Sequence, residues 1–297
     1  MSFDKKAHVF EWIKRLWVHE TRKTELFIPF SLPVSLDIHN AKNLLNRDME
    51  YLVSEKSDGF RCMVLFAFYT EDDEDVPFIA FIDRDYKIEW HSMRNSDSSL
   101  FDGTLLDCER IEHEFIILDT IAINGYVKYN KHFYEREMSA KNYMEEIRFV
   151  VPYNIHMKQW VPVNKIDTLT PKYKNDGFVF IPSSLPVIQN RNKQMYKYKK
   201  THTIDFYIDE HDNMYGSSDG KLVLFDNFVP TENDTNLHSG VYECELVETR
   251  SNKFIFKRVI QRLDKKCGND VDTINSTIKA ITINKISYQD LVNICTT

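Results

Sequence analysis

Short runs rich in aromatic and β-branched residues follow one another along most of this chain. Examples are RCMVLFAFYT, PFIAFID, TLLDCERI and EFIILDTIAI, which are separated by polar or turn-forming residues. The chain has 20 Phe and 15 Tyr against 8 Gly, and flat or branched side chains suit a pleated, half-buried surface. Apolar residues at helical spacing occur in only a few stretches, near 8–20, 135–148, 271–281 and 288–295. The sequence therefore predicts an α+β protein that consists mainly of antiparallel sheet.

Two parts of the chain differ in the spacing of these runs. After Thr203 the predicted strands are short and closely spaced, which is typical of a small barrel. We therefore predict two domains, 1–203 and 204–297, with two helices ending the second. Ser287 followed by Asp290 is an N-cap pattern for the last helix. The acidic stretch from Glu71 to Asp75 is interpreted as a solvated hairpin loop rather than a metal site.

Composition excludes several classes of protein. With 42% apolar and 28% charged residues among 297, the chain is neither disordered nor fibrous. A net charge of −7 is the wrong sign for coating duplex nucleic acid, so any nucleic-acid contact should be local. The five cysteines include no CxxC pair, which argues against a disulfide framework or structural zinc and favours a reducing compartment. The first ten residues do not resemble a signal peptide, and the longest apolar run, from Met63 to Tyr69, is too short to span a bilayer. We expect a soluble, intracellular protein with no membrane partner.

The sharpest local motif is KSDGFR, from Lys56 to Arg61. A strand is predicted to end at Glu55, and a Ser-Asp-Gly turn leads into the next strand at Phe60. Lys56 would therefore be held at a strand end. Alone, this motif is more often a surface turn than a catalytic site.

A second motif is KYK, which places Lys197 and Lys199 two apart on a predicted strand, so that both side chains share a face. Two adjacent ammonium groups suit an anion, although a lone KYK is usually an exposed strand face. Acidic residues also stand at predicted strand ends, namely Asp58, Glu109, Asp119 and Asp176. Carboxylates near a triphosphate suggest Mg²⁺ or Mn²⁺. Together these groups suit phosphoryl or nucleotidyl transfer, in which nearby cations would disfavour the protonated form of Lys56 and stabilise phosphate charge.

The order of the motifs resembles that in the covalent nucleotidyltransferases, which include mRNA capping guanylyltransferases and ATP-dependent DNA and RNA ligases. The resemblance covers about residues 30–297 and is closer to the capping enzymes, because Thr-Ile-Asp-Phe follows KYK. The matching segments, in chain order, are PVSLDIHNAKNLL, KSDGFR, FIDRDYKI, TLLDCE, FIILDTIAING, DGFVFIP, MYKYKKTHTIDF, VYECEL and RLDKKCGN. This resemblance implies a nucleotidyltransferase domain followed by an OB-fold barrel.

The resemblance also implies residue roles. Lys56 would carry GMP, Asp176 and Glu109 would bind a divalent metal, and a set of nucleotide-binding residues would comprise Arg61, Arg84, Glu109, Phe115, Lys197, Lys199, Arg262, Asp264 and Lys265. Within this set, Phe115 would stack on guanine, and the last three would reach the outgoing pyrophosphate when the two domains close.

Three positions depart from the family pattern. Cys108 stands where glycine normally precedes the glutamate, and an alternative alignment on Asp102-Gly103 would put Thr104 in place of Glu109. Ile260 stands where a second arginine normally precedes RLDK, and Arg258 is a candidate substitute. Lys200 replaces a common proline.

The resulting hypothesis is an mRNA guanylyltransferase that moves GMP from GTP, through Lys56 and with Mg²⁺ or Mn²⁺, to the 5′-diphosphate end of RNA. It would act in the nucleus, or in the cytoplasm if the source is a cytoplasmic virus. Its expected partners are a separate RNA triphosphatase, since the chain has no room for one, and the transcription machinery. Two alternatives stay open: an ATP-dependent polynucleotide ligase of the same superfamily, and a non-catalytic scaffold in a capping complex.

Overall fold

The computed structural model describes residues 4–17, 29–46, 48–94, 96–231, 238–251, 253–283 and 286–296. Contacts between residues divide the chain into two compact units. The first comprises Met1–Leu36, Lys42–Tyr198 and Val292–Thr297, and the second comprises Asp37–Ala41 and Lys199–Leu291. The chain thus passes from the first unit to the second between Tyr198 and Lys199, whereas the sequence predicted a boundary near Thr203. The last residues of the chain belong to the first unit again. Each unit is described by itself below.

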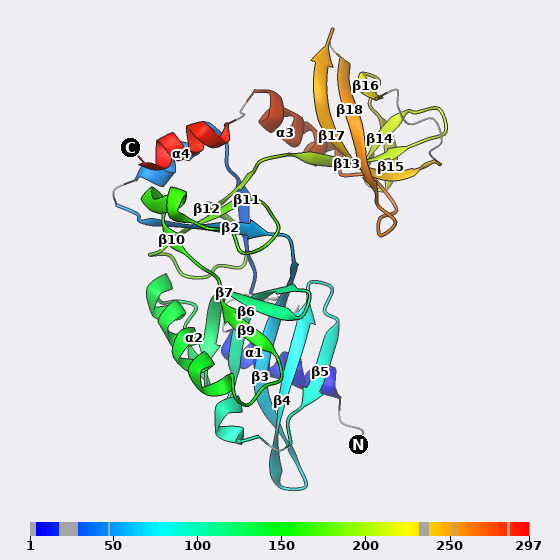
Figure 1. Ribbon diagram of the computed structural model, residues 1–297. Helices are drawn as coiled ribbons and strands as arrows, with labels where there is room; N and C mark the ends of the chain where they lie inside the picture. Colours follow the sequence, from blue (N-terminus) through cyan, green and yellow to red (C-terminus); the bar gives the residue numbers. More distant parts are fainter. Residues whose placement is uncertain are drawn as a thin grey trace. The chain divides into compact units, whose positions relative to one another are not determined.

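The first unit holds two sheets, which are shown in Figure 1. The larger has the order β5-β4-β3-β6-β7-β8, with β9 paired parallel to β7. Its strands are β3 (Phe60–Glu71), β4 (Glu74–Asp83), β5 (Ile88–Ser92), β6 (Thr104–Ile111), β7 (Glu114–Ile123), β8 (Tyr126–Val127) and β9 (Asn154–Met157). The smaller has the order β1-β12-β11-β2-β10. Its strands are β1 (Ser31–Ser35), β2 (Tyr51–Ser57), β10 (Val161–Pro162), β11 (Asn175–Pro182) and β12 (Asn190–Lys199).

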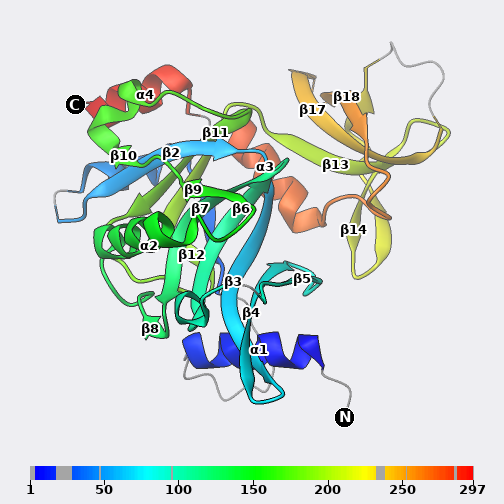
Figure 2. The same cartoon turned by 60° about the horizontal axis from the view of Figure 1, so that its bottom comes forward.

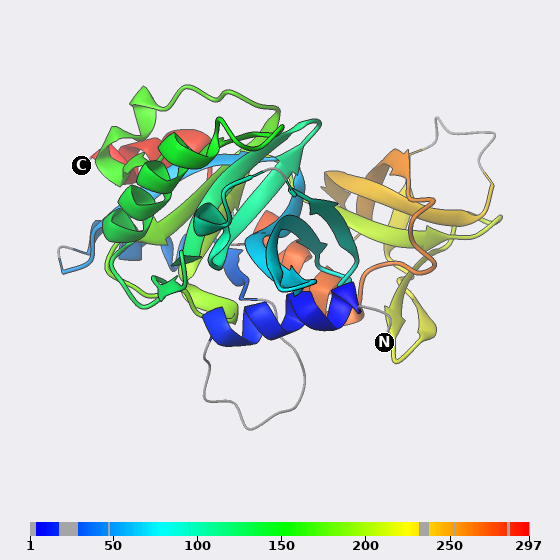
Figure 3. The ribbon, with the colours of Figure 1, turned by 90° about the horizontal axis from the view of Figure 1, so that it is seen from below.

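Side chains alternate along the strands of the larger sheet, so the sheet has two faces. One helix covers each face. Along β3, Met63 and Leu65 pack with the apolar side of α1 (Lys5–Leu16), whereas Val64 and Phe66 pack with α2 (Phe133–Ile147). Figures 2 and 3 show these helices on either side of the strands. β3 is therefore buried on both faces, as its nearly unbroken apolar sequence predicts.

Several local predictions are confirmed. The acidic stretch forms the β3–β4 hairpin turn, where Asp72 and Asp73 adopt positive φ angles. The first helix begins at Lys5, capped by Asp4, which is three residues before the predicted start. Residues 18–20 of the predicted helix lie outside the described residues. Ser287 and Asp290 exchange hydrogen bonds, as expected for a capping box. Among the described residues, 3₁₀ turns lie at Ala41–Leu45, which begins at the boundary between the units, and at Ser98–Phe101 and Val163–Thr168 in the first unit.

The second unit is built on a curled six-stranded sheet with the order β15-β14-β13-β17-β18-β16. Its strands are β13 (Thr203–Ile208), β14 (Met214–Ser218), β15 (Lys221–Leu224), β16 (Phe228–Pro230), β17 (Gly240–Arg250) and β18 (Lys253–Gln261). Its core contains Phe206, Phe256 and, from helix α3 (Val271–Thr282), Ile274. The last helix of the chain is α4 (Tyr288–Thr296). The α+β class is confirmed, while the narrower assignment of this sheet as an OB-fold barrel stays a prediction. None of the described helices is both long enough and apolar enough to cross a membrane.

Candidate functional site

The KSDGFR motif joins the two sheets of the first unit. β2 extends to Ser57, so Lys56 lies within a strand of the smaller sheet, and β3 of the larger sheet begins at Phe60. The two-residue link is fixed by a hydrogen bond from the Asp58 amide to the carbonyl of Lys174. Lys56 is therefore positioned by backbone pairing where the two sheets meet.

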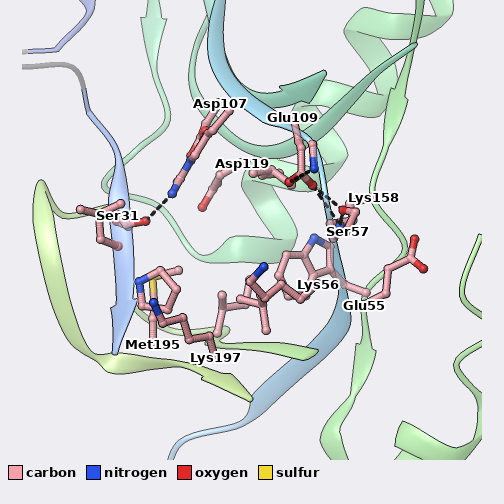
Figure 4. Close-up of a pocket in the computed structure, with 18 of the residues that line it drawn as sticks. Ser31, Glu55, Lys56, Ser57, Asp107, Glu109, Asp119, Lys158, Met195 and Lys197 are labelled. Atoms are coloured by element: carbon pink, nitrogen blue, oxygen red, sulfur yellow. Dashed lines mark hydrogen bonds and ion pairs between the residues drawn. The ribbon is translucent and has the colours of Figure 1, made fainter. Parts of the chain in front are cut away.

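A pocket of about 420 Å³ lies at this junction. Figure 4 shows side chains from both sheets around it. Its polar side chains include Lys56, Arg61, Arg84, Glu109, Asp119, Lys158 and Lys197, and its apolar wall includes Leu118, Trp160, Val179 and Ile181. This mixture of an apolar wall and convergent charged groups suits a nucleotide better than a purely apolar ligand.

Lys56 and Asp176 form an ion pair at the edge of the pocket. The Nζ of Lys56 lies 2.8 Å from Oδ1 of Asp176, which stands near the start of β11, and the side chains are 24% and 36% exposed. Because β2 and β11 are antiparallel neighbours, the sheet register brings together two motifs that are 120 residues apart in the sequence. Within the described part of the chain, Lys56 is thus paired with a carboxylate, whereas the sequence had suggested mainly cations around it.

A buried network occupies the other side of Lys56. Lys158 donates from Nζ to the hydroxyl of Ser57 at 2.5 Å, and Ser57 donates to the carboxylate of Glu109. The Nζ of Lys158 also lies 3.7 Å from Glu109, with its side chain only 4% exposed. Burial lowers the pKa of the Lys158 ammonium, and Glu109 and Glu55 act against that shift. The Nζ of Lys158 is thus fixed inside the pocket by Ser57 and Glu109.

Gly59 permits the close approach that this network needs. A Cβ atom at this position would lie 2.6 Å from Cγ of Glu109 and 2.8 Å from the carbonyl oxygen of Arg110. The Gly59 amide also donates to Oε1 of Glu109 at 3.3 Å. The glycine of the motif is therefore required by contact with β6 rather than by an unusual φ angle.

Arg61 and Asp107 form a buried ion pair across neighbouring strands. Arg61 donates from Nε to Oδ1 of Asp107 at 2.9 Å and from Nη2 to Oδ2 at 2.5 Å, and a third bond reaches the carbonyl of Ser31 at 2.8 Å. Asp107 is 1% exposed. Burial raises the pKa of its carboxyl, and the guanidinium of Arg61 opposes that rise. Arg61 thus supports the pocket structurally as well as lining it.

We expect Arg61→Met to reduce the free energy of unfolding by about 3–5 kcal/mol, because it leaves Asp107 buried without a counter-charge. Urea denaturation of the variant measures this loss. Arg94→Met is the matched control: Arg94 bonds to Glu71 on the surface, with its side chain 60% exposed, and losing such an exposed pair should leave the free energy of unfolding nearly unchanged. Equal stability of the two variants would contradict the structural role given to Arg61.

Of the other residues in this part of the chain that were predicted to bind nucleotide, some line the pocket and others do not. Arg84 and Lys197 line the pocket. Lys199 follows Lys197 on the same strand but belongs to the second unit and does not line the pocket. Glu109 lines it, whereas Thr104, its alternative, is fully buried at the other end of β6 and bonded to Asn124.

Phe115 corrects one expectation. Its ring is 2% exposed and stacks on Phe81 with 4.3 Å between ring centroids. It packs in the core beneath α2 and does not line the pocket. The side chains of β7 that do line it are Leu118 and Asp119. A guanine base cannot stack on a ring that is buried and already stacked on Phe81, so Phe115 has a structural role here.

The expected metal ligands do not converge. Among the residues that the structure describes, no three His, Cys, Asp or Glu side chains are placed to hold a metal ion together. Each relevant carboxylate instead has its own basic partner: Asp176 pairs with Lys56, Glu109 with Lys158, and Asp119 with Arg136. These side chains therefore do not form a ready metal site.

Arg262, Asp264 and Lys265 form a charged cluster within the second unit. Arg262 bonds to Asp264 at 2.8 and 2.9 Å, and both Arg262 and Lys265 pair with the buried carboxylate of Asp205. Asp205 lies in the Thr-Ile-Asp-Phe segment that follows KYK. The two cations of RLDK are thus held on one internal carboxylate.

The departures from the family pattern can now be placed. Cys108 is fully buried and its side chain packs with the core beneath α2, so its thiol lies in the core rather than in the pocket. Ile260 is 58% exposed. Arg258 pairs with Asp212 and its guanidinium lies over the ring of Tyr242, so this arginine is already engaged elsewhere on the second unit. Lys200 has its ammonium 6.0 Å from the ring of Tyr288.

Sequence reasoning missed Lys158, Ser57 and the pairing role of Asp107. The available signal for Lys158 was a single lysine close to Met157 and Trp160 in HMKQWVP. A lone buried charge is rare unless it is paired, but the sequence does not show which partner it finds. Asp107 was noticed only as part of TLLD, and its partner Arg61 is 46 residues away.

Comparison with known proteins agrees with the motif order. Residues 13–201, well over half of the chain, match the family described as mRNA capping enzyme, catalytic domain. Among solved structures, a mycobacterial DNA ligase D complexed with ATP and MES is 13% identical, with 80% of this chain and 95% of that chain covered and a TM-score of 0.44. The ATP-dependent DNA ligase from bacteriophage T7, complexed with ATP, is 12% identical, with 78% and 98% covered and a TM-score of 0.39.

Proposed function

The chain belongs to the family of mRNA capping enzyme catalytic domains, and we propose that it transfers GMP from GTP to the 5′-diphosphate end of RNA. The observation that carries this proposal is the position of Lys56, held within β2 at the edge of a pocket that also contains Lys158, Lys197 and Arg61. Family membership supports nucleotidyl transfer in general. The choice of GTP and RNA rests on the arguments that follow.

In the first half-reaction, the amine of Lys56 attacks the α-phosphorus of GTP. A nitrogen–phosphorus bond forms, the bond from phosphorus to the bridging oxygen breaks, and pyrophosphate leaves with that electron pair. An ammonium has no lone pair for this attack, so Lys56 must first lose a proton. The Asp176 carboxylate, 2.8 Å from Nζ, is placed to accept it. Lys197, across the pocket, supplies positive charge for the phosphate oxygens.

The second half-reaction returns the lysine to its starting state. A terminal phosphate oxygen of the RNA 5′-diphosphate attacks the phosphorus of the adduct and the nitrogen–phosphorus bond breaks. The amine regains a proton, and GMP is left joined to the RNA through a triphosphate bridge. This acceptor requires that the original 5′-triphosphate has lost one phosphate, so we propose a separate RNA triphosphatase as a partner.

Lys158 supports GTP over ATP. Its ammonium can only donate hydrogen bonds, and it is held inside the pocket. Guanine presents a carbonyl oxygen at purine position 6, where adenine presents an amino group, so a fixed donor favours guanine. Loss of a matched buried hydrogen bond can discriminate strongly between such substrates.

We also propose a divalent metal ion, a cellular location and further partners for this activity. Mg²⁺ or Mn²⁺ would be held mainly by the nucleotide phosphates, since such ions commonly bind one or two carboxylates plus substrate oxygens. No step above depends on it. We propose that the enzyme acts on newly made transcripts together with the transcription machinery, in the nucleus or, for a cytoplasmic virus, in the cytoplasm.

The test is incubation with GTP or ATP carrying a radioactive α-phosphate, with Mg²⁺ or Mn²⁺ present. We expect label to stay on the denatured protein with GTP only. Label from ATP alone would favour the polynucleotide ligase alternative, and no label from either nucleotide would favour the non-catalytic scaffold. Lys158→Met should narrow the preference for GTP over ATP, because it removes the donor and keeps most of the side-chain volume.

A further inference from the structure

A second hollow adjoins the catalytic pocket. It has a volume of about 520 Å³, and its lining includes Phe60, Phe81, Ile88, Lys87 and Arg110. Arg61 lines both this hollow and the catalytic pocket. Because side chains alternate along β3, Arg61 and Phe60 point to opposite faces of the strand, and the two spaces lie on either side of its first residues.

Phe60 is the most unusual residue of this hollow. It directly follows Gly59 and is 84% exposed, although burial of such a ring is ordinarily favourable. Alternation along β3 puts it on the same face as Cys62, Val64 and Phe66, which are all packed in the core beneath α2. Phe60 continues this apolar face of β3, but among the described residues its ring is left exposed instead of packed in the core.

The charges around Phe60 balance. The basic residues of the hollow are Arg61, Lys87 and Arg110, and the acidic ones are Asp83, Glu89 and Glu112. Arg110, the cross-strand partner of Phe60, is already paired with Glu89 at 2.9 Å. A neutral hollow does not grip a phosphate backbone by charge, but a ring exposed within it can stack on the flat face of any base.

Position identifies which base this would be. Phe60 is four positions after Lys56 in the sequence, and that length of chain cannot span more than about 14 Å. During transfer the RNA end must reach the phosphorus held on Lys56, while the bound GMP fills the catalytic pocket. A base near the RNA end is then within reach of Phe60 around the start of β3.

We propose that Phe60 is the stacking platform for a base near the 5′ end of the acceptor RNA, an inference that rests on the function proposed above. The contact is independent of base identity, as stacking on aromatic side chains usually is. It also depends little on salt, because few phosphates are neutralised at a charge-balanced site. Both properties agree with an enzyme of net charge −7 that must accept many transcripts.

The test separates the two half-reactions in the full-length protein. We expect Phe60→Ala to raise KM for diphosphate-ended RNA by roughly 5- to 100-fold, while labelling by GTP proceeds as in the unchanged protein. Phe60→Trp should restore a low KM, since it keeps a flat ring. The matched control is Phe149→Ala, which removes a phenyl ring that is 79% exposed but lines neither space.

A series of RNAs with one base removed at the first, second or third nucleotide identifies the partner of Phe60. For the unchanged protein, KM should rise when the stacked base is missing. For Phe60→Ala, removal of that same base should have no further effect, because the contact is already lost. Unchanged KM in Phe60→Ala, or equal additional losses at every abasic position, would overturn the inference. Failure of labelling in the unchanged protein would instead overturn the proposed function.

Discussion

The Lys56→Arg protein is expected to keep its fold and to form no covalent adduct with GMP. Arginine retains the positive charge that pairs with Asp176 at 2.8 Å, so the ion pair at the edge of the pocket can persist. A guanidinium stays protonated at any pH the protein tolerates and cannot attack phosphorus. The adduct is measured as radioactivity from GTP that remains on the protein after denaturation, and the fold by thermal unfolding.

Two controls make this result specific to the nucleophile. Lys42→Arg changes another lysine outside the pocket and should label normally. GTP should still protect Lys56→Arg against thermal unfolding, since binding to the folded state stabilises it. An adduct that survives in the purified Lys56→Arg protein would show that another residue is the nucleophile, and the interpretation of KSDGFR would be wrong.

Much of the local structure could be predicted from the sequence because it depends on neighbours along the chain. Alternation and turn residues predicted the β3–β4 hairpin and the β6–β7 pair, whose two-residue turn lies at Glu112 and His113. The KYK strand also has the expected alternation, with Tyr196 and Tyr198 buried between the more exposed lysines. These features need no knowledge of distant residues.

The contacts that make the pocket could not be predicted in the same way. The Lys56–Asp176 pair depends on the register between β2 and β11, and Lys158 reaches Ser57 across 101 residues. A sequence records which charged residues are present but not which of them share a buried space. For this reason the sequence led us to expect a cluster of metal-binding carboxylates, whereas in the structure each of these carboxylates is paired with a separate basic side chain.

Phe115 illustrates a different limit. The strand from Glu114 to Ile123 was predicted, and an aromatic residue near its start was assigned to the base by family resemblance. Strand periodicity leaves the face undecided when both faces of a strand are buried. Here Phe115 faces the core beneath α2, whereas Leu118 and Asp119 line the pocket.

Lys265→Ala is expected to separate the two half-reactions. Within the second unit, the ammonium of Lys265 pairs with the carboxylate of Asp205, which is 6% exposed and also bonds to Arg262. This pairing fixes the two cations of RLDK in one orientation. If they act on the outgoing pyrophosphate, as family resemblance implies, their removal affects only the step in which pyrophosphate leaves. We therefore expect Lys265→Ala to slow labelling by GTP by about 10²–10³-fold, the usual effect of losing one donor that stabilises transition-state charge.

Transfer from the adduct is the decisive measurement. Lys265→Ala protein that has been labelled by prolonged incubation, then freed of GTP and pyrophosphate, should pass GMP to diphosphate-ended RNA at a rate close to that of the unchanged protein. Lys266→Ala is the matched control, because it removes the same charge from the adjacent exposed position and should label and transfer normally. If Lys265→Ala instead labels normally and fails in transfer, Lys265 acts on the RNA. Equal losses in both variants would mean that only the net charge of the loop matters. Slow labelling with normal transfer would assign Lys265 to the departure of pyrophosphate, since that group is present in the first half-reaction and absent from the second.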